Sequence, residues 1–279
     1  MIRVFVLFLL CFVPLAAGAE DLQPTKDAGP YVPSPQSVVA DMLRYADVGP
    51  DDFLIDLGSG DGRIVLTAAK VFGARGFGVE IKDHLVKQAN EAAQKEGIAD
   101  RVRFLKQDLF KTDVSQATVI TMYLLPDTVN LLKDKFLAEL RPGTRIVSHD
   151  YPLTGWIPEK YVQMDLEDKV QISGVTTTLI YLYVVPARVG GRWSAKMPPA
   201  VSRRPATLQL SQQLTRVSGS ARLDGKEVPL EEFKLRGDKI SFRLSGRRGE
   251  FTGQVRGKSI EGEVVHGRSR QPWSATLGG

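Results

Sequence analysis

The stretch Asp56-Leu57-Gly58-Ser59-Gly60-Asp61-Gly62-Arg63 joins an apolar run of strand length, residues 53–57, to a stretch of helical periodicity, residues 63–72. Its first two glycines let the chain turn sharply and let a ligand lie directly against the backbone. The helix that follows presents unpaired N–H groups and a partial positive charge at its first turn. The stretch therefore predicts a ligand-binding loop between a first strand and a first helix.

The spacing of these glycines argues against a dinucleotide site. A G-x-G-x-x-G fingerprint counted from Gly58 places its third glycine at Arg63, where a long side chain spoils close packing of helix on strand. Asp56 is also unsuited to a diphosphate, because both are negatively charged. A carboxylate here suits a ligand with a cationic amine, and S-adenosylmethionine is such a ligand.

Apolar runs of strand length alternate with helical periodicity over residues 51–185, which is typical of a parallel sheet covered by helices on both faces. Strands are expected at 53–57, 76–80, 102–104, 117–123 and 146–148, and helices at 38–43, 63–72, 83–96 and 127–140. Residues 162–166 and 177–185 are expected to form a late antiparallel hairpin. The fold class is therefore α/β, with a mostly parallel sheet whose last strand is antiparallel.

Acidic residues follow the second and third of these strands. Glu80 ends the second strand, where a carboxylate can accept hydrogen bonds from both hydroxyls of a ribose. Asp108 follows the third strand and can accept from an adenine amino group, while Leu109 or Phe110 covers the ring. Each acid alone is more often a loop carboxylate or a helix cap. Together with Asp56, in this order at the carboxyl edge of the sheet, they predict a nucleoside-binding site.

The last third of the chain has a different pattern. Residues 186–205 hold six prolines and glycines without a sustained period, which predicts a linker. Residues 206–279 alternate with period two and repeat an apolar-x-Gly-x-apolar unit, which predicts a small antiparallel β domain, a curved sheet or half-barrel that packs against the first domain. From Val201 onward fifteen Lys/Arg face eight Asp/Glu. This basic excess indicates a solvated rim or attraction to an anionic membrane or envelope surface. Nucleic-acid binding is less favoured, because the aromatic residues occupy alternating positions with other apolar residues and so belong to the core and not to a base-stacking surface.

The first 19 residues have the three parts of a secretory signal: a basic start, an apolar middle and a small-x-small site after Ala19. We expect export, to a bacterial periplasm, with an uncleaved membrane anchor as the alternative. The only cysteine, Cys11, lies in this segment, so the mature chain has no thiol chemistry, disulfide or zinc-cysteine site. His84 and His266 have no partners at metal spacing, and no metal site is expected.

The glycine loop, Glu80 and Asp108 together resemble the class I methyltransferases over roughly residues 30–185, within an expected methyltransferase domain of residues 20–185. More narrowly, Tyr31-Val32-Pro33-Ser34-Pro35, the unbroken stretch 56–63, and Ser148-His149-Asp150 followed by Trp156 resemble the family of mitochondrial lysine methyltransferases of the ATP synthase c-subunit and the ADP/ATP carrier, with their bacterial relatives. The resemblance implies a Rossmann-like sheet and S-adenosylmethionine as the cofactor.

The resemblance also implies roles for single residues. The implied cofactor-binding residues are Tyr31, Asp56, Gly58, Ser59, Gly60, Glu80 and Asp108, and Tyr123 is placed near the transferred methyl group. The end of the fourth strand, Thr121 to Pro126, departs from the Asp/Asn-Pro-Pro-Tyr motif of amide and adenine amino methyltransferases. This departure makes DNA adenine and glutamine less suitable acceptors.

An amine acceptor must lose a proton before it is methylated, and His149 with Asp150 beside it is the candidate base. The alternative for this histidine is a structural hydrogen bond in a loop. Tyr123 and Trp156 are candidates for an apolar slot that holds the cationic acceptor, or else they are core aromatics.

The sequence is compatible with two functions. The first is an S-adenosylmethionine-dependent methyltransferase acting on a protein amine such as lysine. The second is an exported binding or scaffold protein that retains the fold and attaches through its β domain, because the cofactor is made in the cytoplasm.

Overall fold

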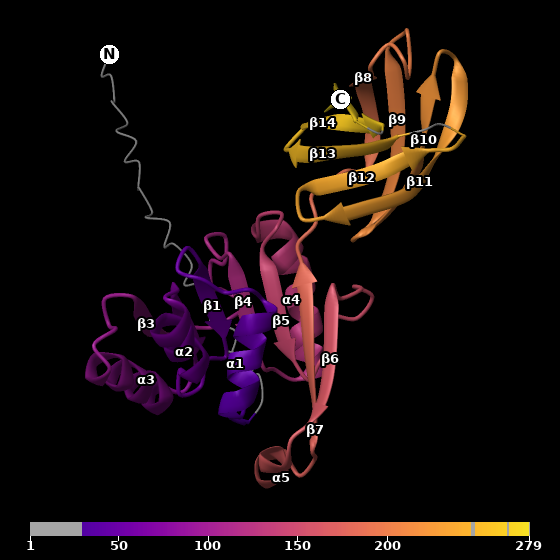
Figure 1. Cartoon of the computed structure of the whole chain (residues 1–279). Coiled ribbons are helices and arrows are strands. Elements are labelled where there is room, and N and C mark those ends of the chain that lie inside the picture. Colours follow the sequence, from indigo (N-terminus) through magenta and orange to yellow (C-terminus); the bar gives the residue numbers. More distant parts are fainter. Residues whose placement is uncertain (1–29, 247–248, 267, 279) are drawn as a thin grey trace, which may run out of the picture.

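The computed structural model describes residues 30–246, 249–266 and 268–278 of the chain. The predicted signal peptide, residues 1–19, lies outside these described residues. Within them, no helix is long and apolar enough to cross a membrane. The chain forms two successive bodies of secondary structure, an α/β part and a β part (Figure 1).

The first body contains a seven-stranded sheet with the strand order β3-β2-β1-β4-β5-β7-β6. Its strands are β1 (Phe53–Leu57), β2 (Arg75–Glu80), β3 (Val102–Lys106), β4 (Val119–Met122), β5 (Arg145–His149), β6 (Lys160–Asp165) and β7 (Thr177–Val184). Strands β1 to β5 pair in parallel, whereas β7 pairs antiparallel with both β5 and β6. This arrangement confirms the predicted fold class.

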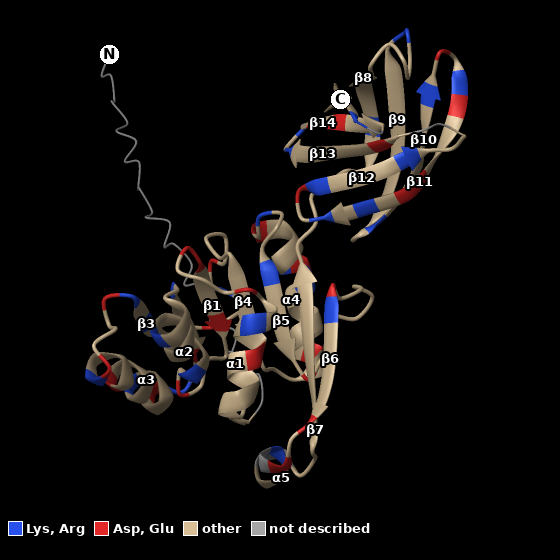
Figure 2. Cartoon of the chain, in the orientation of Figure 1, with Lys and Arg blue, Asp and Glu red and all other residues tan. Residues whose placement is uncertain are grey.

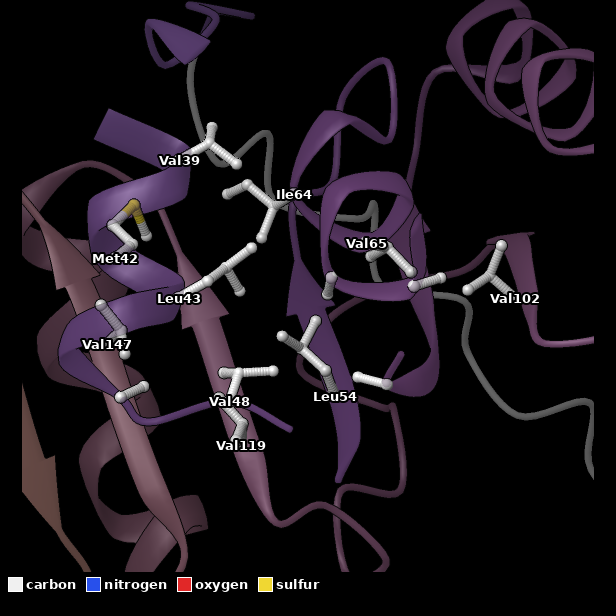
Figure 3. Close-up of a cluster of buried hydrophobic side chains, with 14 of the residues drawn as sticks. Val39, Met42, Leu43, Val48, Leu54, Ile64, Val65, Val102, Val119 and Val147 are labelled. Carbon is white, nitrogen blue, oxygen red and sulfur yellow. The ribbon is translucent and has the colours of Figure 1, made fainter. Parts of the chain in front are cut away.

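Helices cover both faces of the sheet. They are α1 (Gln36–Tyr45), α2 (Arg63–Phe72), α3 (Asp83–Lys95) and α4 (Pro126–Glu139), whereas α5 (Glu167–Ser173) connects β6 to β7. Neighbouring residues of β1 divide between the faces: Leu54 packs with α1, α2 and α3, and Ile55 packs with α4. Figure 3 shows the first of these clusters, where Met42 and Leu43 of α1 lie beside the strands. Strands buried on both faces explain the continuous apolar runs.

Helix α5 is absent from the sequence prediction. The two strands of the expected late hairpin do pair, from Lys160 opposite Leu182 to Asp165 opposite Thr177. The connection between them forms α5, which is only seven residues long. A helix of two turns holds too few apolar residues to display a period, so periodicity alone does not reveal it.

The second body is a closed barrel of eight antiparallel strands. They are β8 (Gly191–Lys196), β9 (Ala206–Gln213), β10 (Arg216–Leu223), β11 (Lys226–Arg236), β12 (Lys239–Leu244), β13 (Glu250–Arg256), β14 (Ser259–His266) and β15 (Ser269–Leu277). Phe233, Phe242 and Phe251 stack with Trp273 edge-on in its core cluster. A Cβ at Gly262 would lie 1.9 Å from the carbonyl oxygen of Thr252, so the repeated glycine permits close approach of the strands.

Two expectations for this region are wrong. The predicted linker, residues 186–205, contains β8, and the half-barrel is closed because β8 pairs with both β9 and β15. Trp193 of β8 is fully buried and donates from Nε1 to the Val189 carbonyl oxygen at 2.8 Å. Strand β8 has only two inward apolar residues, Trp193 and Ala195, and it lies between glycines and prolines. Two residues are too few to reveal an alternating pattern in the sequence.

The barrel joins the edge of the sheet where β5 begins. The N–H of Ala187 donates to the Gly237 carbonyl oxygen at 2.8 Å, and a Cβ at Gly237 would lie 2.9 Å from the Cα of Gly143. Arg236 of the barrel also forms an ion pair with Glu159. Because β5 runs parallel to β1 and β4, the barrel lies away from the carboxyl ends of these strands.

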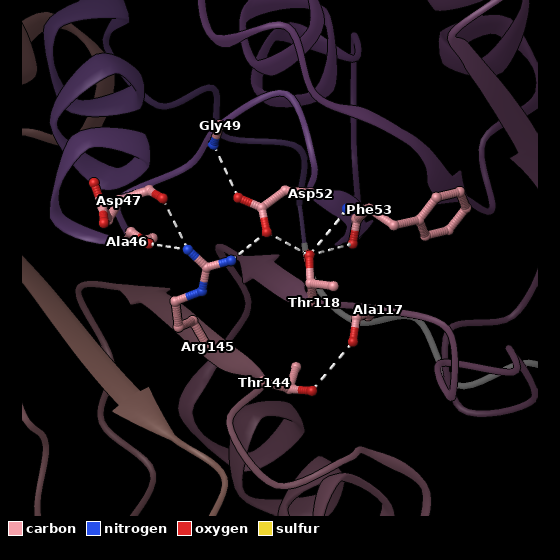
Figure 4. A network of polar contacts seen from close by, with 9 residues as sticks. All are labelled: Ala46, Asp47, Gly49, Asp52, Phe53, Ala117, Thr118, Thr144 and Arg145. Atoms are coloured by element: carbon pink, nitrogen blue, oxygen red, sulfur yellow. Dashed lines mark hydrogen bonds and ion pairs between the residues drawn. The ribbon is translucent and has the colours of Figure 1, made fainter. Parts of the chain in front are cut away.

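A polar network ties α1 to the same amino edge of the sheet (Figure 4). Arg145, the first residue of β5, donates to the carbonyl oxygens of Ala46 at 2.6 Å and Asp47 at 2.8 Å. Its guanidinium also pairs with Asp52, which in turn accepts from Thr118 Oγ1 at 2.6 Å. The network satisfies polar groups at this edge, so its contribution is to stability.

Candidate functional site

A cavity lies at the opposite edge, at the carboxyl ends of β1 to β4. All the residues predicted to bind the cofactor line it, namely Tyr31, Asp56, Gly58, Ser59, Gly60, Glu80 and Asp108. Tyr123, which follows β4, lines it as well. Open α/β sheets bind ligands at this edge, so the cavity is the candidate active site.

The glycine loop forms the floor of the cavity. Gly58 and Gly60 have φ values of +77° and +53°, a region that favours glycine. The N–H groups of Gly58 and Ser59 both donate to the Val79 carbonyl oxygen at 2.9 Å, which holds the loop against β2. A Cβ at Gly60 would lie 2.4 Å from Tyr31 Cε2, so only glycine lets the Tyr31 ring lie over the loop.

Glu80 at the end of β2 has its carboxylate oriented by the main chain. Its Oε2 accepts from the Gly60 N–H at 3.1 Å, and its Oε1 accepts from the N–H groups of Ile81 at 2.8 Å and Lys82 at 2.9 Å. These contacts fix the carboxylate without any ligand. It is therefore preorganised to accept further hydrogen bonds from hydroxyl groups.

Asp56 is a buried acid in the wall of the cavity. It is 2% exposed, and burial raises its pKa to about 7, although a hydrogen bond from Thr121 opposes the rise and the nearby charges of Asp61 and Glu80 add to it. Thr121 Oγ1 donates to Asp56 Oδ1 at 2.7 Å. A cationic group in the cavity would favour the charged form of Asp56.

Asp108 lies after β3 and organises a turn. Its Oδ1 accepts from the Phe110 N–H at 2.8 Å, and its carbonyl oxygen accepts from Thr112 Oγ1 at 2.9 Å. Gln107 and Leu109 line the cavity on either side of it. The cavity thus has a carboxylate at the end of each of the first three strands.

The segment before α1 forms a further wall, of which the sequence interpretation assigned only Tyr31. Arg63 donates from Nη1 to the Ser34 carbonyl oxygen at 2.8 Å and forms an ion pair with Asp61 at 2.6 Å. The Ser34 hydroxyl lies 2.8 Å from His149 Nδ1. Ser34 is therefore held from two sides, and Tyr31 is carried into the cavity with it. In the sequence, only the place of Arg63 at the end of the loop motif 56–63 indicates a role for it.

His149 does not line the cavity. It is fully buried, and burial lowers its pKa to about 4 despite the opposing charge of Asp150. The ring packs against Tyr123 with 3.9 Å between centroids. A buried, neutral imidazole bonded to Ser34 does not fit the predicted direct base. The alternative, a structural hydrogen bond, fits this geometry.

Tyr123 presents a neutral phenol to the cavity. Its hydroxyl donates to Asp150 Oδ2 at 3.0 Å. Burial and the neighbouring Asp150 raise the pKa of Tyr123, so the phenolate is strongly disfavoured. Tyr123 can therefore orient a group in the cavity but does not serve as a base at neutral pH.

Asp150 lies behind Tyr123 and is bound by Lys169 of α5. The Lys169 ammonium is 2.8 Å from Asp150 Oδ1 and 2.7 Å from Oδ2. Burial acts to raise the pKa of Asp150, but His149, Lys169 and the Leu179 N–H outweigh it, so the pKa lies below the usual range. Lys169 was missed because α5 was not predicted.

Trp156 does not contribute to an acceptor slot, so that prediction is wrong. It is 3% exposed and packs in the core cluster against Tyr183, with 5.6 Å between ring centroids. Tyr151 and Leu125 line the cavity in its place. Tyr151 directly follows Asp150 at a strand end, which is the signal that could have identified it.

Comparisons with known proteins agree with this geometry. A family model described as the ANTKMT methyltransferase domain matches residues 56–160, a range that excludes the barrel. A protein-lysine N-methyltransferase of Saccharolobus islandicus is 42% identical over 157 residues, which cover 56% of this chain and 93% of that protein. The adenine nucleotide translocase lysine N-methyltransferase of Mus musculus is 36% identical over 129 residues, covering 46% of this chain and 56% of that protein. The chain thus spans only about half the length of the mouse relative.

A solved structure is also similar. The RNA methyltransferase from Salinibacter ruber, in complex with S-adenosyl-L-homocysteine, is 44% identical, with a TM-score of 0.51. The match covers 57% of this chain and 96% of that one.

Proposed function

The chain belongs to the ANTKMT methyltransferase family, and from this membership we propose that it transfers a methyl group from S-adenosylmethionine to a lysine side chain of a protein. The observation that carries the proposal is the archaeal relative, a protein-lysine N-methyltransferase that this chain matches over 93% of its length. The cavity adds support, because it has a carboxylate at the end of each of the first three strands, where a cationic nucleoside would bind.

The cavity residues fit this cofactor. S-adenosylmethionine supplies a methyl group on a sulfonium, and transfer to a neutral amine breaks that S–C bond, forms an N–C bond and leaves the sulfur neutral. Asp56 would hold the ammonium of the cofactor. Burial raises its pKa to about 7 and no cation is among the described residues that shift it, so an ammonium from a ligand would stabilise its charged form. Glu80 would hold the ribose hydroxyls, and Asp108 the adenine amino group. The glycine loop would accommodate the methionine part, with Tyr31 closing over it.

The acceptor side is formed by Tyr123, Leu125 and Tyr151. Leu125 is 44% exposed, so it offers apolar surface at the mouth of the cavity for the stem of an acceptor side chain. His149 is buried and Tyr123 is held neutral, so neither takes the acceptor's proton at neutral pH. We assign proton loss to water before the amine engages Tyr123. Catalysis would then rest on positioning and exclusion of water.

The test uses macromolecules from cells of the producing organism that lack this gene, so that acceptors are unmethylated. The purified chain is incubated with methyl-labelled S-adenosylmethionine and this extract, with Glu80→Ala as the inactive control. Label recovered as methyl-lysine after complete hydrolysis of protein supports the proposal. Label released by ribonuclease would instead indicate an RNA acceptor, the class of acceptor for which the Salinibacter ruber enzyme is named, and overturns the lysine proposal. Cofactor binding without labelling would favour a scaffold.

We also propose that the chain is exported and that its barrel attracts an anionic membrane or envelope surface. The support is the signal-like segment 1–19 and the basic excess from residue 201 onward. Figure 2 shows Lys and Arg along β10, β11 and β12 of the barrel. Cell fractionation with the mass of the mature chain tests export: cleavage after Ala19 supports it, whereas an intact amino terminus in the cytoplasm contradicts it. Binding to vesicles with anionic lipid and not to neutral vesicles tests the surface.

A further inference from the structure

Helix α5 contributes a buried lysine to the rear of the active site. Lys169 is 2% exposed, and its ammonium contacts both oxygens of Asp150 as well as the Thr177 carbonyl oxygen. Lysine is almost never buried to this extent unless it is paired. Because an ammonium buried without a charged partner is strongly destabilising, the position of Lys169 requires Asp150 to remain charged.

The Asp150 carboxylate is fully engaged by these contacts. Oδ1 accepts from Lys169 and from the Leu179 N–H at 3.0 Å, and Oδ2 accepts from Lys169 and from the Tyr123 hydroxyl at 3.0 Å. These four hydrogen bonds, from three donor groups, occupy about as many lone-pair sites as a carboxylate offers. The backbone of Asp150 is also left-handed, with φ of +63°, a conformation that residues other than glycine rarely adopt. Asp150 is therefore built as a fixed acceptor, not as a base.

This arrangement determines the direction of the Tyr123 hydroxyl. A phenol has one proton, and in Tyr123 that proton is donated to Asp150. Tyr123 lines the cavity, and its phenol oxygen is left with only lone pairs for a group that enters. A nucleophile with an N–H or O–H can donate to this oxygen and so turn its own lone pair elsewhere.

We propose that Lys169 is a positioning residue for methyl transfer: by holding Asp150 as a carboxylate, it keeps Tyr123 as a hydrogen-bond acceptor toward the incoming nucleophile. The inference depends on methyl transfer alone and not on whether the acceptor is lysine. It therefore stands or falls separately from the proposed acceptor.

Removal of the ammonium should make the reaction sensitive to pH. The titratable groups that face Asp150 are Tyr123 after β4, His149 on its own strand, Lys169 of α5 and Tyr181 of β7. Loss of Lys169 removes a cation that lowers the pKa of Asp150 and leaves the Leu179 N–H and the buried His149 to oppose the effect of burial, so the pKa of Asp150 rises. At low pH a protonated Asp150 can donate its proton to the Tyr123 oxygen instead of accepting from it, so that oxygen is no longer a free acceptor for the nucleophile and activity falls. As pH rises, the carboxylate returns and activity recovers.

The experiment compares Lys169→Met with the matched control Lys160→Met, an exposed lysine on β6. Rates are measured with whichever macromolecule the wild-type chain labels. For Lys169→Met we expect kcat to fall about 10- to 100-fold at pH 6.5 and to approach that of the control at pH 9, with KM for S-adenosylmethionine within about twofold. The double variant Asp150→Asn with Lys169→Met should lose this new pH dependence. A kcat lowered equally at every pH, as a merely structural role predicts, overturns the proposal.

A second measurement needs no acceptor. The Asp150 carboxyl is followed by carbon NMR through a pH titration of the wild-type chain and of Lys169→Met, assigned by comparison with Asp150→Asn. We expect the carboxyl of the variant to titrate above pH 6.5, as the fall in kcat at that pH requires, and that of the wild type to titrate well below it. An unchanged titration, with S-adenosylhomocysteine binding intact as evidence of folding, overturns the proposal even if no acceptor has been found.

Discussion

Strand β1 has a carboxylate close to each end, and the two have opposite surroundings. Asp52, just before the strand, accepts from the Gly49 N–H and Thr118 Oγ1 and pairs with Arg145 (Figure 4). Asp56, near the carboxyl end, accepts from Thr121 and lines the cavity with its pKa raised to about 7. The protein supplies a cation at the amino edge and leaves a ligand to supply one at the carboxyl edge. One edge is built for stability and the other for binding.

The largest effect should come from breaking the amino edge. Arg145→Met leaves Asp52 and the carbonyl oxygens of Ala46 and Asp47 without their donor, so we expect the free energy of unfolding to fall by about 3 kcal/mol. The dissociation constant for S-adenosylhomocysteine should stay within about twofold. Urea unfolding and calorimetry measure the two quantities, and Arg141→Met, an exposed arginine nearby, is the control. A large loss of affinity with unchanged stability would contradict the division between the edges.

Breaking the carboxyl edge should have the reverse result. In Glu80→Ala the cavity loses a carboxylate that is already oriented by three N–H groups, and we expect binding of S-adenosylhomocysteine to weaken about 100-fold, or about 2.7 kcal/mol. Calorimetry measures the affinity. Glu91→Ala, an exposed glutamate on α3, should bind like the wild type. Binding by Glu80→Ala within threefold of wild type would remove Glu80 from the site.

The two edges also differ in how far the sequence predicts them. Gly58, Gly60, Glu80 and Asp108 lie in short motifs directly after strands, so the position of each strand end places the residue. The amino-edge network depends on Arg145 reaching α1 and Asp52, 93 residues away or more, which follows from strand order and not from local pattern.

The same distinction separates the predicted site residues that line the cavity from those that do not. His149 ends β5, and Trp156 follows that strand. The position of a strand end does not show whether a side chain points into the cavity or into the core. Tyr123 lines the cavity, whereas His149 beneath it is buried. Lys169 reaches Asp150 from a connection whose structure no periodicity predicts. Contacts between distant segments are therefore the part of the site that needs the fold.

The raised pKa of Asp56 gives a sharper test of the binding edge. The ammonium of the ligand needs the carboxylate form, which in the free protein is half populated near pH 7. Between pH 6 and 7.5 the charged fraction rises roughly eightfold, so affinity for S-adenosylhomocysteine should rise by the same factor with increasing pH. Calorimetry across this range measures it. Asp56→Asn should bind more weakly with little dependence on pH, and a flat wild-type profile would contradict the assignment of the ammonium to Asp56.

The smallest effect concerns Ser34, which connects the amino-terminal wall of the cavity to His149. Ser34→Ala removes the hydrogen bond between the hydroxyl and His149 Nδ1, a contact worth about 1 kcal/mol, while the bond from Arg63 to the Ser34 carbonyl remains. We expect the dissociation constant for S-adenosylhomocysteine to rise about three- to fivefold, because Tyr31 is held over Gly60 less firmly. Ser37→Ala, an exposed serine on α1, should leave it unchanged. Equal affinities in the two variants would mean that the Arg63 contact alone positions this wall, and that His149 contributes only to the stability of the sheet.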